Sequence, residues 1–196
     1  MKCMFVSDVH GSVERLQECI KIFESENADK LVLLGDTGSQ MDRTSNEKIA
    51  EILNKIKDKV QLIRGNCDTV DFEELLEFNL LNMDNVYMNG IFVTITHGHN
   101  YNCYDLPSYC GEIFMQGHTH VPMLQKAKDV ILANPGSVTK PRGVDLKCYI
   151  IIDEETIALK TLEGKVVNSI KIKWKMLKTI RTTRLEVKRT FKSNFL

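Results

Sequence analysis

Five short blocks of the sequence contain side chains of the kinds that bind metal ions in proteins. The blocks are Asp8-Val9-His10, Gly35-Asp36, Gly65-Asn66, His97-Gly98-His99 and Gly117-His118-Thr119-His120. They supply seven candidate ligands with oxygen or nitrogen donor atoms: Asp8, His10, Asp36, Asn66, His97, His118 and His120. Mixed imidazole and oxygen donors suit Mn, Fe, Zn or Ni, whereas oxygen donors alone would suit Mg or Ca. The order and spacing of these residues therefore predict a site for two divalent transition-metal ions.

The chemistry that such a pair of ions supports is displacement at phosphorus. Asp8 and His10 lie two residues apart on a loop, so both can face one ion, and the carboxylate of Asp36 can bridge two. Two ions roughly 3.5–4 Å apart can hold a bridging hydroxide and clamp the attacking and leaving oxygens of an in-line displacement. Because bound water loses its proton near neutral pH, the attack needs no general base from the protein.

A short apolar run stands before each of the five blocks. The runs cover residues 3–6, 31–34, 60–63, 91–95 and 113–115. Near-continuous apolar runs bounded by glycine and polar residues are typical of buried strands. In open α/β sheets the functional residues gather outside the carboxyl ends of the strands. Five strands that end in ligands at one edge would deliver those ligands to a common cleft.

The remaining pattern predicts helices and further strands around this sheet. Apolar residues at helical spacing predict helices over 12–25 and 46–56, with a short helix or helical turn over 71–78. Residues 86–95 predict a hairpin whose Asn89-Gly90 turn favours type I′ geometry. Further strands are expected around Met123, Val130, Tyr149, Ile157 and Val167. The aromatic segment between His99 and Ile113 could shape a substrate pocket or simply pack as a loop.

The ordered blocks, followed by Asn134-Pro135-Gly136-Ser137, resemble the calcineurin-like metallophosphoesterase superfamily. More narrowly, they are similar to its small single-domain phosphodiesterases of the YfcE type, and the likeness spans roughly residues 1–165. The resemblance implies an α/β fold, a four-layer α-β-β-α sandwich in which two mixed sheets lie face to face with helices outside.

The resemblance also implies how the ligands are shared between the two metal ions. Asp8, His10, Asp36 and His120 would hold the first ion. Asp36, Asn66, His97 and His118 would hold the second, so that Asp36 is common to both. The implied cofactors are two divalent ions, with Mn2+ as the first choice and Ni2+, Zn2+ or Fe2+ as alternatives.

One position departs from the wider superfamily and leaves the catalytic acid open. Many members have a histidine after the metal-binding asparagine, where this chain has Cys67. A thiol is a weaker hydrogen-bond donor than an imidazolium. His99 is the nearest alternative acid, and we assign catalytic roles to Asn66 and His99. The other alternative is a substrate whose leaving group needs little protonation.

Each candidate also has an ordinary structural explanation when it is taken alone. Asp8 could help to cap the helix that starts near Ser12. His97 or His118 could be a hydrogen-bonded loop histidine, and Asp36 could belong to a turn. These separate explanations do not account well for all the blocks together, because every block directly follows a predicted strand. Lesser candidates could shape loops, finish turns or meet solvent; they are Asp68, Thr69, Ser137 and Arg142.

Length and composition agree with one α/β domain, which we place at residues 1–164. The chain has 196 residues, is 43% hydrophobic and contains no apolar run near the ~20 residues of a membrane span. It enters a strand at once, so no signal peptide is predicted. Its six cysteines contain no C-x-x-C pair and are expected to be reduced thiols. The cytoplasm is the expected compartment.

Residues 165–196 differ sharply in charge from the rest of the chain. They contain 10 Lys and Arg against Glu186 alone, whereas residues 1–164 contain 16 Lys and Arg against 25 Asp and Glu. The sequence predicts a last edge strand with a lysine face over 170–176, then a basic amphipathic extension. A charged edge also discourages aggregation between sheets. The extension could dock on the acidic core of its own or a neighbouring chain, or contact nucleic acid or an anionic membrane. Docking or self-association is our first choice.

We therefore interpret the chain as a metal-dependent phosphodiesterase that acts on a small phosphate ester with a metal-bridging hydroxide. The enzymatic alternative is a phosphomonoesterase or nucleotide hydrolase, because monoester and diester sites share these metals. The non-enzymatic alternative is a protein-interaction scaffold of the Vps29 type, which has this fold with altered metal ligands. Every ligand position here holds a competent side chain, which favours the enzyme.

Overall fold

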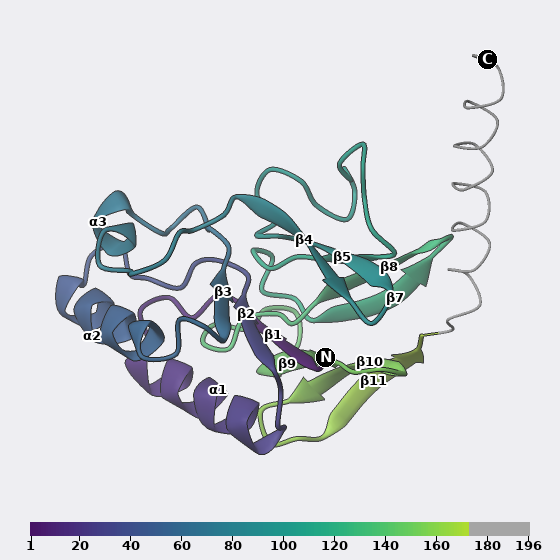
Figure 1. Ribbon diagram of the computed structural model, residues 1–196, viewed down its shortest axis with the longest axis horizontal. Helices are drawn as coiled ribbons and strands as arrows, with labels where there is room; N and C mark the ends of the chain where they lie inside the picture. Colours follow the sequence, from purple (N-terminus) through teal and green to yellow (C-terminus); the bar gives the residue numbers. More distant parts are fainter. Residues whose placement is uncertain (173–196) are drawn as a thin grey trace, which may run out of the picture.

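The computed structural model describes residues 1–172, which form eleven strands and three helices (Figure 1). In chain order they are β1 (Cys3–Val6), α1 (Val13–Ser25), β2 (Lys30–Leu33), α2 (Arg43–Asn54), β3 (Val60–Leu62), α3 (Val70–Glu73), β4 (Met83–Met88), β5 (Ile91–Thr96), β6 (Ile113–Met115), β7 (Met123–Ala127), β8 (Val130–Asn134), β9 (Cys148–Ile152), β10 (Thr156–Thr161) and β11 (Val166–Lys171). The strands expected before the five metal-binding blocks are present as β1, β2, β3, β5 and β6.

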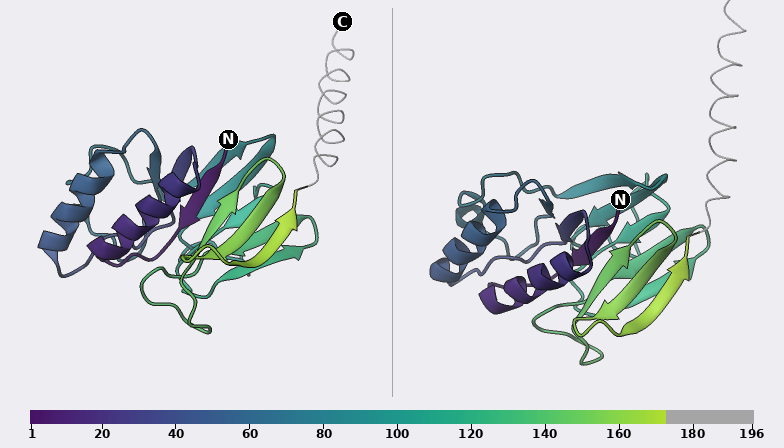
Figure 2. Two further views of the ribbon diagram at one scale, coloured as in Figure 1. Left: turned by 90° about the horizontal axis from the view of Figure 1, so that it is seen from below. Right: turned by 60° about the horizontal axis from the view of Figure 1, so that its bottom comes forward.

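The strands form two mixed sheets. The six-stranded sheet has the order β11-β10-β9-β1-β2-β3, in which β1, β2 and β3 are parallel and the other strands are antiparallel to their neighbours. The five-stranded sheet has the order β4-β5-β6-β8-β7, with β5, β6 and β8 parallel. The views in Figures 1 and 2 show the sheets stacked, with α1 and α2 outside the six-stranded sheet. The predicted pair of mixed sheets is confirmed.

Two apolar cores lie on the two faces of the six-stranded sheet. On β1, Cys3 and Phe5 belong to the core between the sheets, whereas Met4 and Val6 belong to the core beneath the helices. All four side chains are completely buried. A strand that is buried on both faces needs no polar side, which explains why these runs are continuously apolar rather than alternating.

The three helices begin at polar capping residues. Each cap accepts a hydrogen bond from the backbone N–H three residues later; the caps are Ser12, Asp42 and Thr69. The cap at Asp42 makes α2 begin at Arg43, earlier than the predicted start at Asn46. The third helix, α3, is a single turn that ends at Glu73 and is shorter than predicted. None of the helices among residues 1–172 is long and apolar enough to cross a membrane.

The outer face of the five-stranded sheet carries a loop rather than a helix. Thr94, on that face of β5, accepts a hydrogen bond from Gly111 N at 2.8 Å, and Cys103 N donates to Gln116 Oε1 at 2.7 Å. The segment between β5 and β6 contains Pro107, which cannot continue a helix, and several loop-forming residues. Within the described residues, all three helices therefore belong to the six-stranded sheet, and the expected outer layer on the second sheet is this loop.

The last described strand, β11, lies at the edge of the six-stranded sheet, as predicted. It pairs antiparallel with β10, from Val166 to Lys171. The remainder of the predicted strand, including Trp174 and Met176, lies outside the described residues, as does the predicted amphipathic extension. The boundary drawn between residues 164 and 165 stays a prediction.

Candidate metal centre

The five blocks follow their strands and meet where the two sheets come together. Hydrogen bonds between backbone groups continue past the strand ends: His10 N donates to Asp36 O at 2.8 Å, and Gly117 N donates to His97 O at 2.8 Å. These contacts hold the loops in register with one another. Beside them lies a cleft of about 510 Å³, lined by His10, Asp36, Asn66, Cys67, His118, Thr119, His120, Lys140 and Arg142.

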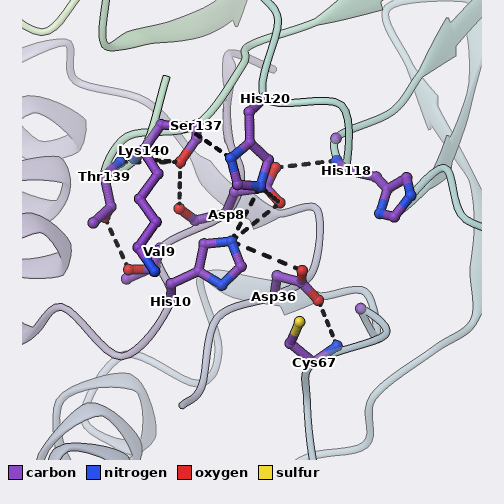
Figure 3. Close-up of polar contacts among 12 residues, drawn as sticks. Asp8, Val9, His10, Asp36, Cys67, His118, His120, Ser137, Thr139 and Lys140 are labelled. Atoms are coloured by element: carbon purple, nitrogen blue, oxygen red, sulfur yellow. Dashed lines mark hydrogen bonds and ion pairs between the residues drawn. The ribbon is translucent and has the colours of Figure 1, made fainter. Parts of the chain in front are cut away.

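Asp8, His10 and His120 form the first group of donor atoms, drawn in Figure 3. His10 Nε2 lies 3.1 Å from His120 Nε2 and 3.8 Å from Asp8 Oδ1. Asp8 Oδ1 also lies 3.2 Å from His120 Nε2. Donor atoms from each of these three residues lie within 4.8 Å of one another, which is close enough for one ion to contact all of them.

Asp36 lies between this group and a second one. Its Oδ2 is 3.9 Å from His10 Nε2, and its Oδ1 is 3.4 Å from His97 Nε2. His97 Nε2 is in turn 3.1 Å from the amide oxygen of Asn66. The rings of His97 and His118 have their centroids 5.1 Å apart. The structure thus brings all seven predicted ligands together, with Asp36 in the middle.

Two of the histidines are oriented by backbone carbonyl groups. His97 Nδ1 donates to Leu34 O at 2.7 Å, and His120 Nδ1 donates to Lys140 O at 2.7 Å. A neutral imidazole whose Nδ1 carries the proton has its lone pair on Nε2. In both residues Nε2 faces the cluster, which is the tautomer and orientation that a metal-binding histidine requires.

A buried oxygen without a hydrogen bond supports the fit of a cation. Asp8 Oδ2 accepts a hydrogen bond from His118 N at 3.1 Å, but Asp8 Oδ1 is buried and accepts none. A buried polar atom without a partner costs free energy that a bound ion would recover. The residues present therefore fit a divalent cation at this place.

The backbone of the site is held in a rarely populated conformation. Five of the seven candidate ligands have positive φ angles: Asp8 (58°), His10 (49°), Asp36 (49°), His118 (66°) and His120 (62°). Such angles are uncommon for residues other than glycine and cluster at functional sites. The strain is maintained by the surrounding loops, which fix the direction of each donor.

Charges within the cluster shift several pKa values. Burial alone would raise the pKa of Asp36, but hydrogen bonding and charge from His97 and the backbone N–H of Cys67 lower it well below its usual range. Burial would lower the pKa of His97, but the Asp36 carboxylate raises it. Burial lowers the pKa of His10 and of His118. The cluster therefore keeps Asp36 ionised at neutral pH, the state in which a carboxylate binds cations.

Asp68 and Ser137, which sequence reasoning placed among the lesser candidates, hold the loops together. The Asp68 carboxylate accepts three backbone hydrogen bonds of 2.8 Å, from Thr37, Gly38 and Gly65. It thereby connects the loop that carries Asp36 with the loop that carries Asn66. The Ser137 hydroxyl donates to Asp8 O at 2.8 Å.

His99 and Cys67, the two residues considered for the catalytic acid, both lie near the candidate ligands. His99 is exposed, and its ring centroid is 5.4 Å from that of His97 and 6.3 Å from that of His118. Cys67 lines the cleft, and burial together with the neighbouring Asp36 raises the pKa of its thiol to about 12. The thiol is therefore protonated at neutral pH, whereas burial and the neighbouring His97 and His118 lower the pKa of His99.

Lys140 is a cleft residue that sequence reasoning missed. Its side chain, together with that of Arg142, lines the cleft beside His10 and His120. The signal was present in the sequence, because Lys140-Pro141-Arg142 comes directly after the turn at Ser137. Only the folded chain shows that this segment returns to the carboxyl end of β1.

Comparison with known proteins gives matches along most of the chain. Residues 1–156 match the family model of the calcineurin-like phosphoesterase superfamily domain. Phosphodiesterase YfcE of Escherichia coli is 31% identical over 173 residues, which cover 84% of this chain and 94% of that protein. A phosphodiesterase of Methanocaldococcus jannaschii is 24% identical over 143 residues, covering 69% of this chain and 83% of that one.

Solved structures show the same similarity. The structure of YfcE, a phosphoesterase from E. coli, matches with a TM-score of 0.81 and 29% identity, covering 88% of this chain and 100% of that one. A mutant Vps29 from Entamoeba histolytica matches with a TM-score of 0.62 and 17% identity, covering 88% of this chain and 100% of that one. The likeness to Vps29 concerns the fold alone.

Proposed function

Because the chain belongs to the calcineurin-like phosphoesterase superfamily and is a hydrolase acting on ester bonds, we propose that it is a metal-dependent phosphodiesterase with two metal ions. The relatives from E. coli and M. jannaschii, both named as phosphodiesterases, support the choice of a diester over a monoester. The substrate is a small phosphate ester that fits the cleft, and the expected compartment stays the cytoplasm.

In this proposal the ligands are shared between the two ions as the family resemblance implies. Asp8, His10, Asp36 and His120 would hold the first ion. Asp36, Asn66, His97 and His118 would hold the second. The observation that carries the assignment is the position of Asp36, whose two oxygens face His10 on one side and His97 on the other.

Bound divalent ions, for which Mn2+ is our first choice, would activate a water molecule and polarise the phosphoryl oxygens. The chain's own residues would orient the ligands, contact the phosphate and supply the proton. Backbone hydrogen bonds at Nδ1 hold His97 and His120 with Nε2 toward other candidate ligands, Asn66 and His10 respectively. In this proposal the exposed His99 would give a proton to the leaving oxygen, and Asn66, whose side chain lines the cleft, would contact the phosphate.

The test is a metal and substrate screen of the purified, metal-depleted chain. We expect two Mn per chain after reconstitution, measured by elemental analysis. We also expect faster hydrolysis of bis(p-nitrophenyl) phosphate than of p-nitrophenyl phosphate, with Ni, Zn and Mg compared in parallel. A preference for the monoester with every metal would favour the phosphomonoesterase alternative. A loaded protein without activity on either ester would contradict the enzymatic proposal.

A further inference from the structure

Two cationic side chains line the cleft without a charge partner of their own. Lys140 and Arg142 are both exposed, and neither has a carboxylate within ion-pair distance among residues 1–172. The three other arginines in that range each pair with a glutamate; they are Arg15, Arg43 and Arg64. Arg142 is thus the arginine of the described chain that is available to an outside anion, and it faces the cleft.

The segment that carries these cations is fixed to the candidate metal ligands. Lys140 N donates to Ser137 Oγ at 2.8 Å, and the same hydroxyl donates to Asp8 O at 2.8 Å. His120 Nδ1 donates to Lys140 O at 2.7 Å, and Arg142 N donates to His120 O at 2.9 Å. Figure 3 shows the hydrogen bonds of Ser137 and Lys140 around Asp8. The backbone of both residues is therefore fixed beside the first group of candidate ligands. Pro141, which lies between them, restricts the backbone further.

The reacting diester does not need these two charges. In the proposed site, the carboxylates of Asp8 and Asp36, a hydroxide nucleophile and the single negative charge of the diester balance two divalent ions. Lys140 and Arg142 are then left as surplus positive charge at the cleft. A surplus of this size is matched by a group with about two negative charges, which a phosphate monoester carries at neutral pH.

We propose that Lys140 and Arg142 bind a second phosphate group of the substrate, so that the preferred substrate is a phosphate diester that also carries a phosphate monoester. This inference rests on the proposed function of the same site. An arginine binds phosphate oxygens through two parallel hydrogen bonds, and a lysine adds a compact point charge. The two residues act as specificity determinants and leave the bond-breaking step to the ligand cluster.

A matched pair of substrates tests the proposal. Thymidine 5′-(p-nitrophenyl phosphate) carries one charge, and its 3′-phosphorylated form has the same nucleoside and leaving group with an added phosphate monoester. With the full chain loaded with Mn, we expect a kcat/KM about tenfold or more higher for the phosphorylated form, mainly through a lower KM.

Variants of Lys140 and Arg142 then test whether these two side chains cause the preference for the phosphorylated substrate. Arg142→Gln and Lys140→Gln should each lower kcat/KM on the phosphorylated substrate about tenfold and change it less than about twofold on the other. Arg142→Lys should retain an intermediate preference, because it keeps the charge and loses the paired hydrogen bonds. Lys126→Gln is the matched control, since Lys126 is an exposed cation on β7 that does not line the cleft, and its substrate ratio should equal that of the wild type.

Binding of the product gives a readout that does not depend on turnover. Thymidine 3′,5′-bisphosphate should bind the wild type more tightly than thymidine 5′-phosphate, and both glutamine variants should lose this difference. Equal kcat/KM for the two substrates would overturn the inference and leave the phosphodiesterase proposal standing. An equal loss on both substrates in the variants would also overturn it, because the cations would then serve the reacting phosphate. If neither substrate were hydrolysed with any metal, the proposed function would fail, and product binding would still decide the role of the two cations.

Discussion

Asp36 is the residue on which the proposed mechanism depends most. It stands between the two groups of donors, its Oδ1 accepts a hydrogen bond from Cys67 N at 2.7 Å, and it has a positive φ of 49°. Asparagine tolerates this backbone conformation and keeps the shape of the side chain. A change to asparagine therefore separates the charge of Asp36 from its structural role.

We expect Asp36→Asn to abolish most of the activity while the fold survives. Removing the bridging charge should cost several kcal/mol of transition-state stabilisation, or about a thousandfold in rate. Diester hydrolysis with Mn and circular dichroism measure the two effects. Asp58→Asn, at an exposed position outside the cleft, is the control. A folded Asp36→Asn protein with near-normal rates would rule out the two-metal mechanism.

The roles of His99 and Cys67 can be separated by comparing substrates with good and poor leaving groups. If His99 is the general acid, His99→Gln should slow substrates with poor leaving groups by roughly 10²–10⁴-fold and those with good ones much less. If the protonated Cys67 thiol only packs beside Asp36, Cys67→Ser should leave the rate within a few-fold. Rates on a series of aryl and alkyl diesters provide the comparison. An equal loss on all of them would remove His99 from the acid role and leave it a supporting residue.

At the scale of elements, the loops after β2 and β3 approach each other so closely that only glycine fits at position 65. A Cβ atom there would lie 2.1 Å from both the backbone N and the Oδ1 of Asp36. The clash is with backbone as well as side chain, so the loop itself would have to move. The close approach at Gly65 thereby helps to set the position of Asp36, a candidate metal ligand.

Gly65→Ala should therefore weaken metal binding by about 10–100-fold, the range seen when the support of a metal ligand is removed. Titration calorimetry with Mn measures this, and circular dichroism checks that the sheets persist. Gly164→Ala is the control, because a Cβ atom at Gly164 meets nothing within 4 Å. The φ of +86° at Gly164 adds some backbone strain to this variant but no contact with a candidate ligand. Unchanged Mn affinity in Gly65→Ala would show that the loops adjust freely.

Glu26, at the end of α1, joins the helix to the six-stranded sheet. Lys2 and Lys160 form ion pairs with its carboxylate at 2.8 and 2.7 Å, and the Tyr149 hydroxyl donates to it at 2.7 Å. Partial burial alone would raise the pKa of this carboxylate, but the hydrogen bonds from its three partners lower it to about 2. The contact therefore stabilises the folded chain only while the carboxylate is ionised.

The pH dependence of Glu26 has a definite sign. A carboxyl whose pKa is lower in the folded chain than its ordinary 4.5 adds stability above pH 4.5 and loses it as the pH falls toward 2. We expect Glu26→Gln to lower the free energy of unfolding at pH 7 by about 1–3 kcal/mol, with a smaller difference from the wild type near pH 2. Urea unfolding at several pH values measures this. Glu24→Gln, an exposed neighbour on α1, should change little, and a pH-independent effect of Glu26→Gln would contradict the assignment.

At the scale of the whole molecule, the chain is divided into parts of opposite charge. Residues 165–196 hold 10 Lys and Arg and a single Glu, while the acidic excess lies in residues 1–164. Charge complementarity favours association of the basic extension with the acidic core of the same or a neighbouring chain. Among residues 1–172, the cleft is lined by side chains between His10 and Arg142.

Truncation after Trp174 should leave diester hydrolysis within about twofold and change the oligomeric state or the tendency to aggregate. Light scattering of the full and truncated chains measures assembly. Binding of anionic vesicles and of nucleic acid across a range of salt concentrations is measured in parallel. Unchanged assembly with a loss of salt-sensitive polyanion binding would favour a tether over docking.

The sequence by itself determined most of the elements and the list of candidate ligands. Continuous apolar runs specify strands that are buried on both faces, and the polar block after each run marks its carboxyl end. The Asn89-Gly90 pair predicted its turn, because both residues adopt the positive φ angles, 48° and 88°, that a type I′ turn requires. The family, the mixed sheets and the hydrolase class were predicted from the resemblance that the ordered blocks carry, and they are confirmed.

Only the tertiary structure decided which residues support the ligands and what surrounds them. Asp68 was ambiguous in the sequence, since its three hydrogen-bond donors come from two loops that only folding brings together. The position of Lys140 could not be predicted for the same reason. It lines the same cleft as His10, although the two residues lie more than a hundred positions apart in the sequence. The sequence allowed the segment between His99 and Ile113 to pack as a loop, but its position over the second sheet depends on a contact between Gly111 and Thr94 that only folding forms. Long-range contacts are set by how whole elements pack, so the residue pattern of one short segment does not show which distant segment it will contact.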